Sequence, residues 1–227
     1  MKQNATADYQ SYRDLQIEAN ERKFHRVWAC PREMAVVAQL VRRHAGPPAF
    51  GLCHGARNGQ EVRLLRFEFG GDTEILGTDI SPTAESVRDM VQWDFHDENP
   101  AWNGRADFIY SNSWDHTYDI DKLAAAWAAT LRPGGVAVVE WTIHHDEQGT
   151  GVYDCFGCSE DELAAAFTRA GLTEVERARM PGGFNTAKPA VRVALRDGAA
   201  DPLADGRQTE YIGADCELVL LTFRRAA

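Results

Sequence analysis

The stretch FGLCHGARNGQE, residues 50–61, decides how the whole chain is interpreted. A short apolar run ends there in small residues, and the run GQEVRLLRFEF at 59–69 places apolar residues at helical spacing. This order predicts a buried strand, a glycine-containing turn and a helix. Glycine lets a backbone approach a ligand closely, and a helix N-terminus offers unpaired N–H groups. The same corner also serves ordinary packing of a strand on a helix, so the stretch alone leaves both interpretations open.

The segments that follow this corner alternate between strand-like and helix-like patterns. Strands are predicted at 49–54, 74–80, 90–95, 106–112, 136–143, 172–180 and 216–225. Helices are predicted at 59–69, 81–90, 120–131 and 159–171, with a turn RPGG at 132–135. Strands that alternate with helices form a parallel sheet with right-handed crossovers. The sequence therefore predicts an α/β domain, preceded by helices at 7–29 and 31–44.

Composition and charge argue against several classes of function. The chain has 227 residues, 44% of them hydrophobic, which suits one domain with a sizeable core. Its formal net charge is −10, so no nucleic-acid partner is expected, because such binding relies on Lys and Arg. No apolar run is long enough for a membrane span, and the polar N-terminus predicts no secretory signal. Five cysteines, an odd number, then indicate reduced thiols and a cytoplasmic location.

Polar side chains follow the predicted strands at the edge where ligands bind in open α/β sheets. Asp79, in GTDIS, follows the second strand, where a carboxylate can accept hydrogen bonds from two ribose hydroxyls. Capping of the next helix is the structural alternative, although Ser81 already suits that role. Asp94 follows the third strand and Asn112 the fourth, within YSNSWDHTYD at 110–119. Each signal is modest by itself, and their order along the chain strengthens all of them.

Residues 49–142 resemble the class I S-adenosylmethionine-dependent methyltransferases. The motifs that carry the resemblance are GTDIS at 77–81, LRPGG at 131–135 and the whole segment from the fourth to the fifth strand, 110–142. The resemblance implies a Rossmann-like, seven-stranded, mostly parallel sheet with helices on both faces. It also implies an enzyme that uses S-adenosylmethionine and releases S-adenosylhomocysteine. The expected domains are a helical N-terminal segment or lid, 1–46, and the methyltransferase domain, 47–227.

The resemblance assigns cofactor-binding roles to the residues after the strands. Asp79 is expected to hold the ribose hydroxyls, with Ile80 beside the adenine. Asp94 and Phe95 are expected to recognise the adenine, and Asn112 is expected to lie near the sulfonium.

The first loop departs from the family pattern at two places. Gly51, Cys53 and Gly55 are expected to pass under the methionine end of the cofactor, but Cys53 stands in place of a glycine. An apolar residue also stands where the family has an acid that helps to hold the ammonium of the cofactor. We hypothesise that Glu61 takes over this role.

The acceptor is predicted to be a small molecule that is methylated on oxygen or nitrogen. Its cleft is expected between the N-terminal segment and the loops at 110–118, 143–158 and 181–190. The aromatic residues in these loops favour an organic ligand: Trp114, Trp141, Tyr153 and Phe156. No nucleic acid, membrane or metal partner is expected, and a homodimer is an open alternative to a monomer.

A general base is needed if the acceptor atom carries a proton. His116, His144 and His145 are the catalytic candidates, since a neutral imidazole can accept a proton near pH 7. The structural alternative for His116 is support of its own loop. For the adjacent pair it is an exposed loop position without a catalytic role.

Three other functions stay open from the sequence. The histidines at 144–145 with Cys155 and Cys158 have residue types that bind zinc. Tyr118 and Lys122 have the Tyr-x-x-x-Lys spacing of short-chain dehydrogenases that use NAD(P), although they follow a different strand from the pair in that family. A non-catalytic relative could also keep the methyltransferase fold as a binding module.

Overall fold

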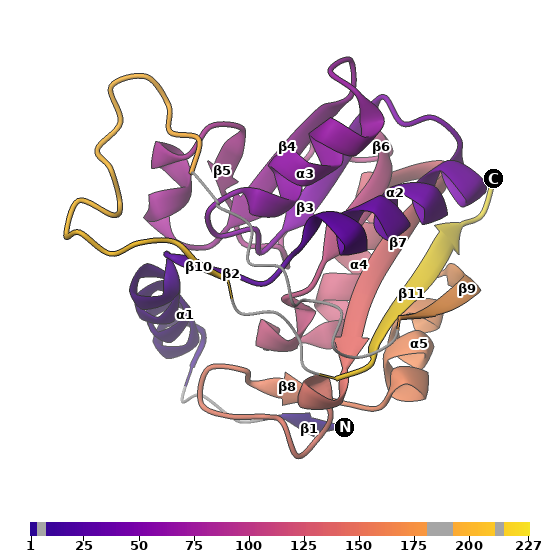
Figure 1. Ribbon diagram of the computed structural model, residues 1–227. Coiled ribbons are helices and arrows are strands. Elements are labelled where there is room, and N and C mark those ends of the chain that lie inside the picture. The colour runs from indigo at the N-terminus through magenta and orange to yellow at the C-terminus, as the bar shows by residue number, and fades with distance from the viewer. Residues whose placement is uncertain (4–7, 181–192, 212–215) are drawn as a thin grey trace.

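A seven-stranded sheet lies at the centre of the computed structural model, which describes residues 1–3, 8–180, 193–211 and 216–227 (Figure 1). The strand order is β5-β4-β3-β6-β7-β11-β9. The strands are β3 (Phe50–His54), β4 (Glu74–Asp79), β5 (Met90–Gln92), β6 (Ala106–Ser111), β7 (Leu131–Thr142), β9 (Leu172–Met180) and β11 (Leu218–Arg225). The first five pair in parallel, and β11 runs antiparallel to both neighbours. The predicted Rossmann-like fold class is confirmed.

Helices cover both faces of the sheet, because successive residues of a strand point to opposite sides. Phe108 and Tyr110 of β6 belong to the buried cluster under α2 (Pro31–Ala45) and α3 (Gln60–Phe69). Ile109, between them, belongs to the cluster under α4 (Ile120–Thr130) and α5 (Glu160–Arg169) on the other face (Figure 1). Strands that are buried on both faces explain the continuous apolar runs in the sequence.

The N-terminal segment contains two helices with different positions. α1 (Tyr9–Lys23) lies beside the carboxyl ends of β4 and β5, where Asn20 donates to Asp79 and Tyr9 donates to Asp94. α2 instead packs on the sheet, and its apolar stripe is fully buried there: Met34, Val37, Ala38 and Val41. Of these two helices, only α1 lies at the edge of the sheet for which a lid was predicted.

The prediction of one helix at 81–90, between β4 and β5, is wrong beyond its first turn. A short 3₁₀ helix, η1 (Pro82–Ser86), forms there, and the chain then becomes extended. Backbone hydrogen bonds join Arg88 to Ala194 and Ser86 to Arg196. These bonds to a distant segment take up the backbone groups that a longer helix would use.

The predicted turn at 132–135 is part of β7 in the structure. Pairing of β6 with β7 jumps from Ala106–Leu131 to Phe108–Val136, so the residues between them on β7 form a bulge. Gly135 suits the bulge, because a Cβ there would lie 2.7 Å from the carbonyl oxygen of Ala106.

Short elements organise the loops at the ends of the sheet. β1 (Lys2–Gln3) pairs with β8 (Phe156–Gly157), and β2 (Arg26–Val27) pairs with β10 (Glu210–Tyr211). The 3₁₀ helices η2 (Trp114–His116) and η3 (Ile143–His145) follow β6 and β7. Residues 181–190, predicted for the acceptor cleft, lie outside the described residues. In the described part of the chain, no helix combines the length and the hydropathy that crossing a membrane requires.

Gly51 should be essential for the packing of β3 on β6. A Cβ at this position would lie 2.0 Å from the fully buried ring of Phe108, so Gly51→Ala forces a strand or a ring to move. We expect a loss of about 1–3 kcal/mol in the free energy of unfolding in urea. Gly71→Ala is the matched control, because its Cβ would meet no heavy atom within 4 Å. Equal stability of the two variants would contradict this packing.

Candidate functional site

Asp79, at the end of β4, ties three segments of the chain together. Its Oδ2 accepts hydrogen bonds from the backbone N–H of Arg57 (3.0 Å) and from Nδ2 of Asn20 in α1 (2.7 Å). Its Oδ1 accepts from the N–H of Ser81 (3.0 Å). Burial raises the pKa of this carboxyl above its usual value, against the opposing effects of the Ser81 N–H and the Arg57 guanidinium. Asp79 is thus a buried acceptor with two backbone donors and one side-chain donor, Asn20 of α1.

The loop between β3 and α3 turns sharply beneath this carboxylate. Gly55 has φ 72°, and Arg57 has φ 39°, a left-handed value that few residues other than glycine adopt. A Cβ at position 55 would lie 2.6 Å from Cβ of Ser113, so glycine makes room for the loop after β6. The Arg57 guanidinium is buried and donates to the carbonyl of Arg26, while its Nε has no partner among the described residues.

A first cavity, with about 500 Å³ of empty space, lies between α1 and these strand ends. Asp79, Ile80 and Phe95, three of the predicted cofactor residues, meet in its wall. Tyr12 and Asn20 of α1 close the opposite side. A few polar groups in a wall that is otherwise apolar and aromatic are typical of small-molecule sites. The buried carboxylate in this wall can accept hydrogen bonds from ligand hydroxyl groups.

Asp94 does not line this cavity but lines another one, which shares Ile80 and Trp93 with the first. Its carboxylate accepts from the Tyr9 hydroxyl (2.7 Å) and from both the backbone N–H and Nδ1 of His96 (3.0 and 2.6 Å). Burial opposes ionisation, but these hydrogen bonds and His96 hold the pKa of Asp94 below its usual value. An adenine amino group reaches Asp94 only if Tyr9 moves, so this prediction needs a movement of α1.

Glu61 and Asn112 form a polar pair at the other side of the first loop. Glu61 is buried in the first turn of α3, and Asn112 follows β6. Oε2 of Glu61 and Nδ2 of Asn112 have no hydrogen-bond partner among the described residues. Burial raises the pKa of Glu61 to about 7, although its own backbone N–H, the Arg57 guanidinium and the Asn112 amide lower it. The Glu61 oxygen is an acceptor and can bind a ligand ammonium, whereas the NH2 of Asn112 is a donor and suits a ligand acceptor or the Glu61 carboxyl itself.

The predicted residues Gly51 and Cys53 line neither cavity. Gly51 faces the Phe108 ring inside the sheet. Cys53 belongs to the core cluster under α2 and α3, where burial raises the pKa of its thiol. Of the three loop residues predicted to contact the cofactor, Gly55 alone borders the first cavity.

A second cavity, with about 1230 Å³ of empty space, opens beside the first. The two share four lining residues: Lys23, Arg57, Ser113 and His116. Asn112 and the predicted bases His144 and His145 line the second cavity only. The structure therefore brings all three candidate histidines to one cleft, with His116 at the junction.

Hydrogen bonds distinguish two of these histidines. The carbonyl of Tyr153 lies 2.9 Å from Nδ1 of His116, so Nδ1 carries the proton and Nε2 is an acceptor. The backbone N–H of Thr142 donates to Nδ1 of His145 (3.0 Å), so its proton is on Nε2. Burial lowers the pKa of His145, which is therefore neutral. His116 is the better placed base of the two, and His144 is exposed at the rim of the cleft.

The other chemical alternatives receive no geometric support. Cys155 and Cys158 are buried, and burial raises the pKa of each thiol to about 12. The Cys155 thiol donates to backbone carbonyls, so it serves as a packed neutral group and not as a zinc ligand. Nζ of Lys122 donates to the Tyr118 hydroxyl (2.9 Å), but neither residue lines the two cavities.

Three residues of the cavity walls escaped the sequence analysis. Asn20 and Lys23 come from α1, and Asp154 comes from the loop after β7. Long-range contacts bring these segments together, for example the bond from Gln16 of α1 to the carbonyl of Tyr153 (2.8 Å). Asp115, within the predicted 110–119 segment, does line the second cavity.

Several solved structures are similar to this chain. The 1,6-didemethyltoxoflavin-N1-methyltransferase of Burkholderia thailandensis, solved with 1,6-didemethyltoxoflavin and S-adenosylhomocysteine, has TM-score 0.64 and 17% identity, covering 98% of this chain and 92% of that chain. The Haloferax volcanii protein solved with the Trm112 methyltransferase activator has TM-score 0.61 and 17% identity, covering 98% and 100%. The N-methyltransferase NodS of Bradyrhizobium japonicum, with S-adenosylhomocysteine, has TM-score 0.59 and 16% identity, covering 94% and 100%.

The chain has the fold of the class I methyltransferases. Comparison with models of known families gave no match. Comparison with the sequences of curated proteins gave none either. The identities to the solved structures are all low, so the likeness concerns the fold, and function must be argued from the site.

Glu61 should make the stability of the protein depend on pH. Its pKa rises from an ordinary value of 4.5 to about 7 on folding, so the folded state binds more protons between these values. The free energy of unfolding should therefore fall, by roughly 3 kcal/mol at most, as pH rises from 4.5 to 7. Urea unfolding at pH 5 and pH 8 should show a smaller difference for Glu61→Gln than for the wild type. An unchanged difference would place the titration elsewhere.

Proposed function

We propose that this protein transfers a methyl group from S-adenosylmethionine to a small-molecule acceptor. The observation that carries the proposal is the pair of joined cavities at the carboxyl edge of the sheet. One has a buried carboxylate beside Ile80 and Phe95. The other is lined by Asn112, whose amide acts on the buried carboxyl of Glu61 and lowers its pKa against the effect of burial. These features match, in order, the ribose, the adenine and the ammonium of this cofactor.

Different residues of this chain bind different parts of the cofactor. Asp79 accepts the ribose hydroxyls in place of Asn20, and Ile80 and Phe95 enclose the adenine. Glu61 binds the ammonium once the carboxyl group is ionised. The carboxylate end lies near Arg57, whose buried Nε lacks a partner among the described residues.

The bound cofactor supplies a methyl group that its sulfonium already activates. The chain contributes alignment and exclusion of water, which together account for most of the catalysis in such a displacement. α1 closes the first cavity through its contacts with Asp79 and with the loop at 143–158. The acceptor enters the second cavity, and His116 at the junction is the candidate base.

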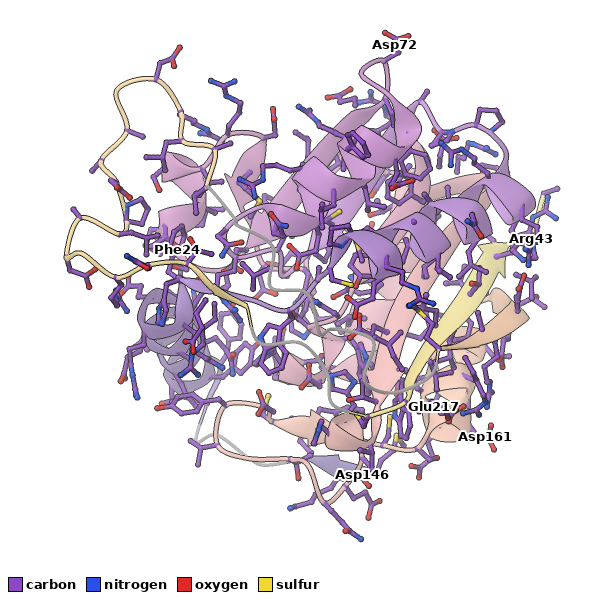
Figure 2. The ribbon with its side chains drawn as sticks, in the orientation of Figure 1. Phe24, Arg43, Asp72, Asp146, Asp161 and Glu217 are labelled. Atoms are coloured by element: carbon purple, nitrogen blue, oxygen red, sulfur yellow. The ribbon has the colours of Figure 1, made fainter. Side chains whose placement is uncertain are left out.

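Binding of the product S-adenosylhomocysteine should report the cofactor site directly. We expect S-adenosylhomocysteine to bind in isothermal titration, and Asp79→Asn to weaken it at least about 10-fold, because one charged acceptor of the ribose hydroxyls is lost. Asp72→Asn is a matched control, since this exposed side chain points out of the molecule from the loop after α3 (Figure 2). No binding to the folded wild type would reject the cofactor and favour a non-catalytic binding module.

The same titration should depend on pH through Glu61. Below the raised pKa of about 7 the carboxyl group is protonated and attracts the ammonium weakly, so affinity should rise as pH increases from 6 to about 7.5. Glu61→Gln should bind more weakly at pH 7.5 and show a flat profile over this range. A wild-type profile without this rise would remove Glu61 as the partner of the ammonium.

A further inference from the structure

Three polar side chains in the second cavity form a compact acidic cluster. The ligand atoms of Asp115, His116 and Asp154 all lie within 4.8 Å of one another. Asp115 and His116 come from η2 after β6, whereas Asp154 comes from the loop after β7. The bond from Gln16 of α1 to the carbonyl of Tyr153 fixes that loop beside the cluster. The cluster therefore borders the junction of the two cavities.

Asp115 is a buried carboxylate without a hydrogen bond from any described residue. Its side chain is 8% exposed, and Nε2 of His145 lies 4.0 Å from its Oδ2, too far for a hydrogen bond. His145 is neutral, because burial lowers its pKa, so it provides no balancing charge. A carboxylate this buried is costly unless a cation pairs with it. Asp115 thus points into the cavity as an unpartnered anion.

His116 completes the cluster with an acceptor atom. Its Nδ1–H donates to the carbonyl of Tyr153, which leaves the lone pair of Nε2 facing Asp154 Oδ1 at 3.6 Å. A lone pair and two carboxylates around one point form a site for a cation that carries several N–H groups. Hydrogen bonds of about 2.8 Å from one ammonium place its acceptors about 4.6 Å apart, which is within the 4.8 Å that bounds the cluster, although Nε2 of His116 and Oδ1 of Asp154 are closer, at 3.6 Å.

The other ionisable groups of the cleft form no hydrogen bond or ion pair with Asp115 among the described residues. The charges of Asp79 and Glu61, and also that of Asp154, act on the buried Arg57 guanidinium. Nζ of Lys23 lies 5.4 Å from the centre of the Tyr153 ring; burial lowers the pKa of this ammonium, and the charges of Asp154 and Asp115 oppose the shift without a direct ion pair. Glu140 accepts from the Tyr110 hydroxyl, and burial raises its pKa well above the usual value.

We propose that Asp115, His116 and Asp154 bind the ammonium group of an amine acceptor, which makes the reaction an N-methylation. This inference rests on the proposed function. Trp28, an exposed indole that lines the same cavity, offers the aromatic face that organic cations prefer.

The chemistry follows from this placement. Nε2 of His116 takes one proton from the bound ammonium, which frees the lone pair of its nitrogen. The nitrogen attacks the methyl carbon of S-adenosylmethionine, so the C–N bond forms while the C–S bond breaks and its electron pair stays on sulfur. The products are S-adenosylhomocysteine and the methylated ammonium, whose charge the two carboxylates continue to balance.

Matched ligands test this site without the natural acceptor. Phenethylamine, tryptamine and cadaverine are titrated at pH 7 into the protein with S-adenosylhomocysteine, beside 2-phenylethanol, tryptophol and 1,5-pentanediol. We expect amines to bind more tightly than their alcohols, and Asp115→Asn to weaken the amines about 10- to 100-fold. His116→Gln should keep the binding of the amines and lower methylation of those that react.

Controls separate this inference from the proposed function. Asp72→Asn, far outside the cleft, should bind the amines as the wild type does. Asp115→Asn should still bind S-adenosylhomocysteine. If the wild type binds the amines but does not bind S-adenosylhomocysteine, the proposed function alone is overturned. Equal binding of amines and alcohols would overturn the amine site. Binding of Mn²⁺ or Zn²⁺ that Asp115→Asn abolishes, without amine binding, would assign the cluster to a metal and overturn it too.

Discussion

The buried carboxylate of Asp79 is the constraint on which the arrangement of the site depends. It receives the N–H of Arg57 from the first loop, the N–H of Ser81 from its own strand end and the side-chain amide of Asn20 from α1. The two backbone donors fix the carboxylate relative to the sheet. The third donor belongs to a helix that packs across the strand ends. In the proposed function, the ribose hydroxyls would take the place of this third donor.

Acidic groups are spread along the cleft. Asp79 lines the first cavity, and Asp115 and Asp154 line the second. Arg57 and His116 border both cavities. In the proposed arrangement, His116 would stand where donor and acceptor meet, and the separate acids would hold the ammonium of the cofactor and that of an amine apart.

The sequence predicts the positions that regular alternation determines. Strands that are buried on both faces and end in polar residues predict the ligand edge, and Asp79, Ile80 and Phe95 do lie together there. The family resemblance placed Gly51 and Cys53 at the cofactor, but both residues lie within β3 and serve packing. Local pattern alone does not show which residues of a strand are inside the sheet and which border the ligand.

Long-range contacts determine the rest of the site, and a local pattern carries no signal for them. Asn20 reaches Asp79 across 59 positions of sequence, and Asp154 reaches the cleft because α1 holds its loop. The failed helix between β4 and β5 has the same origin, since backbone bonds to Ala194 and Arg196 replace helical ones. Resemblance to a family gave the fold and the general place of the cofactor, while the chemistry of the acceptor side depends on these distant partners.

The most direct test of the proposed cofactor site is a crystal structure of the protein with S-adenosylhomocysteine. The account predicts that the adenosine lies in the first cavity and that its ribose hydroxyls bind Asp79. Asn20 is then displaced from Asp79, and the ammonium of the ligand binds Glu61. An adenosine bound elsewhere, with Asn20 still on Asp79, would contradict it.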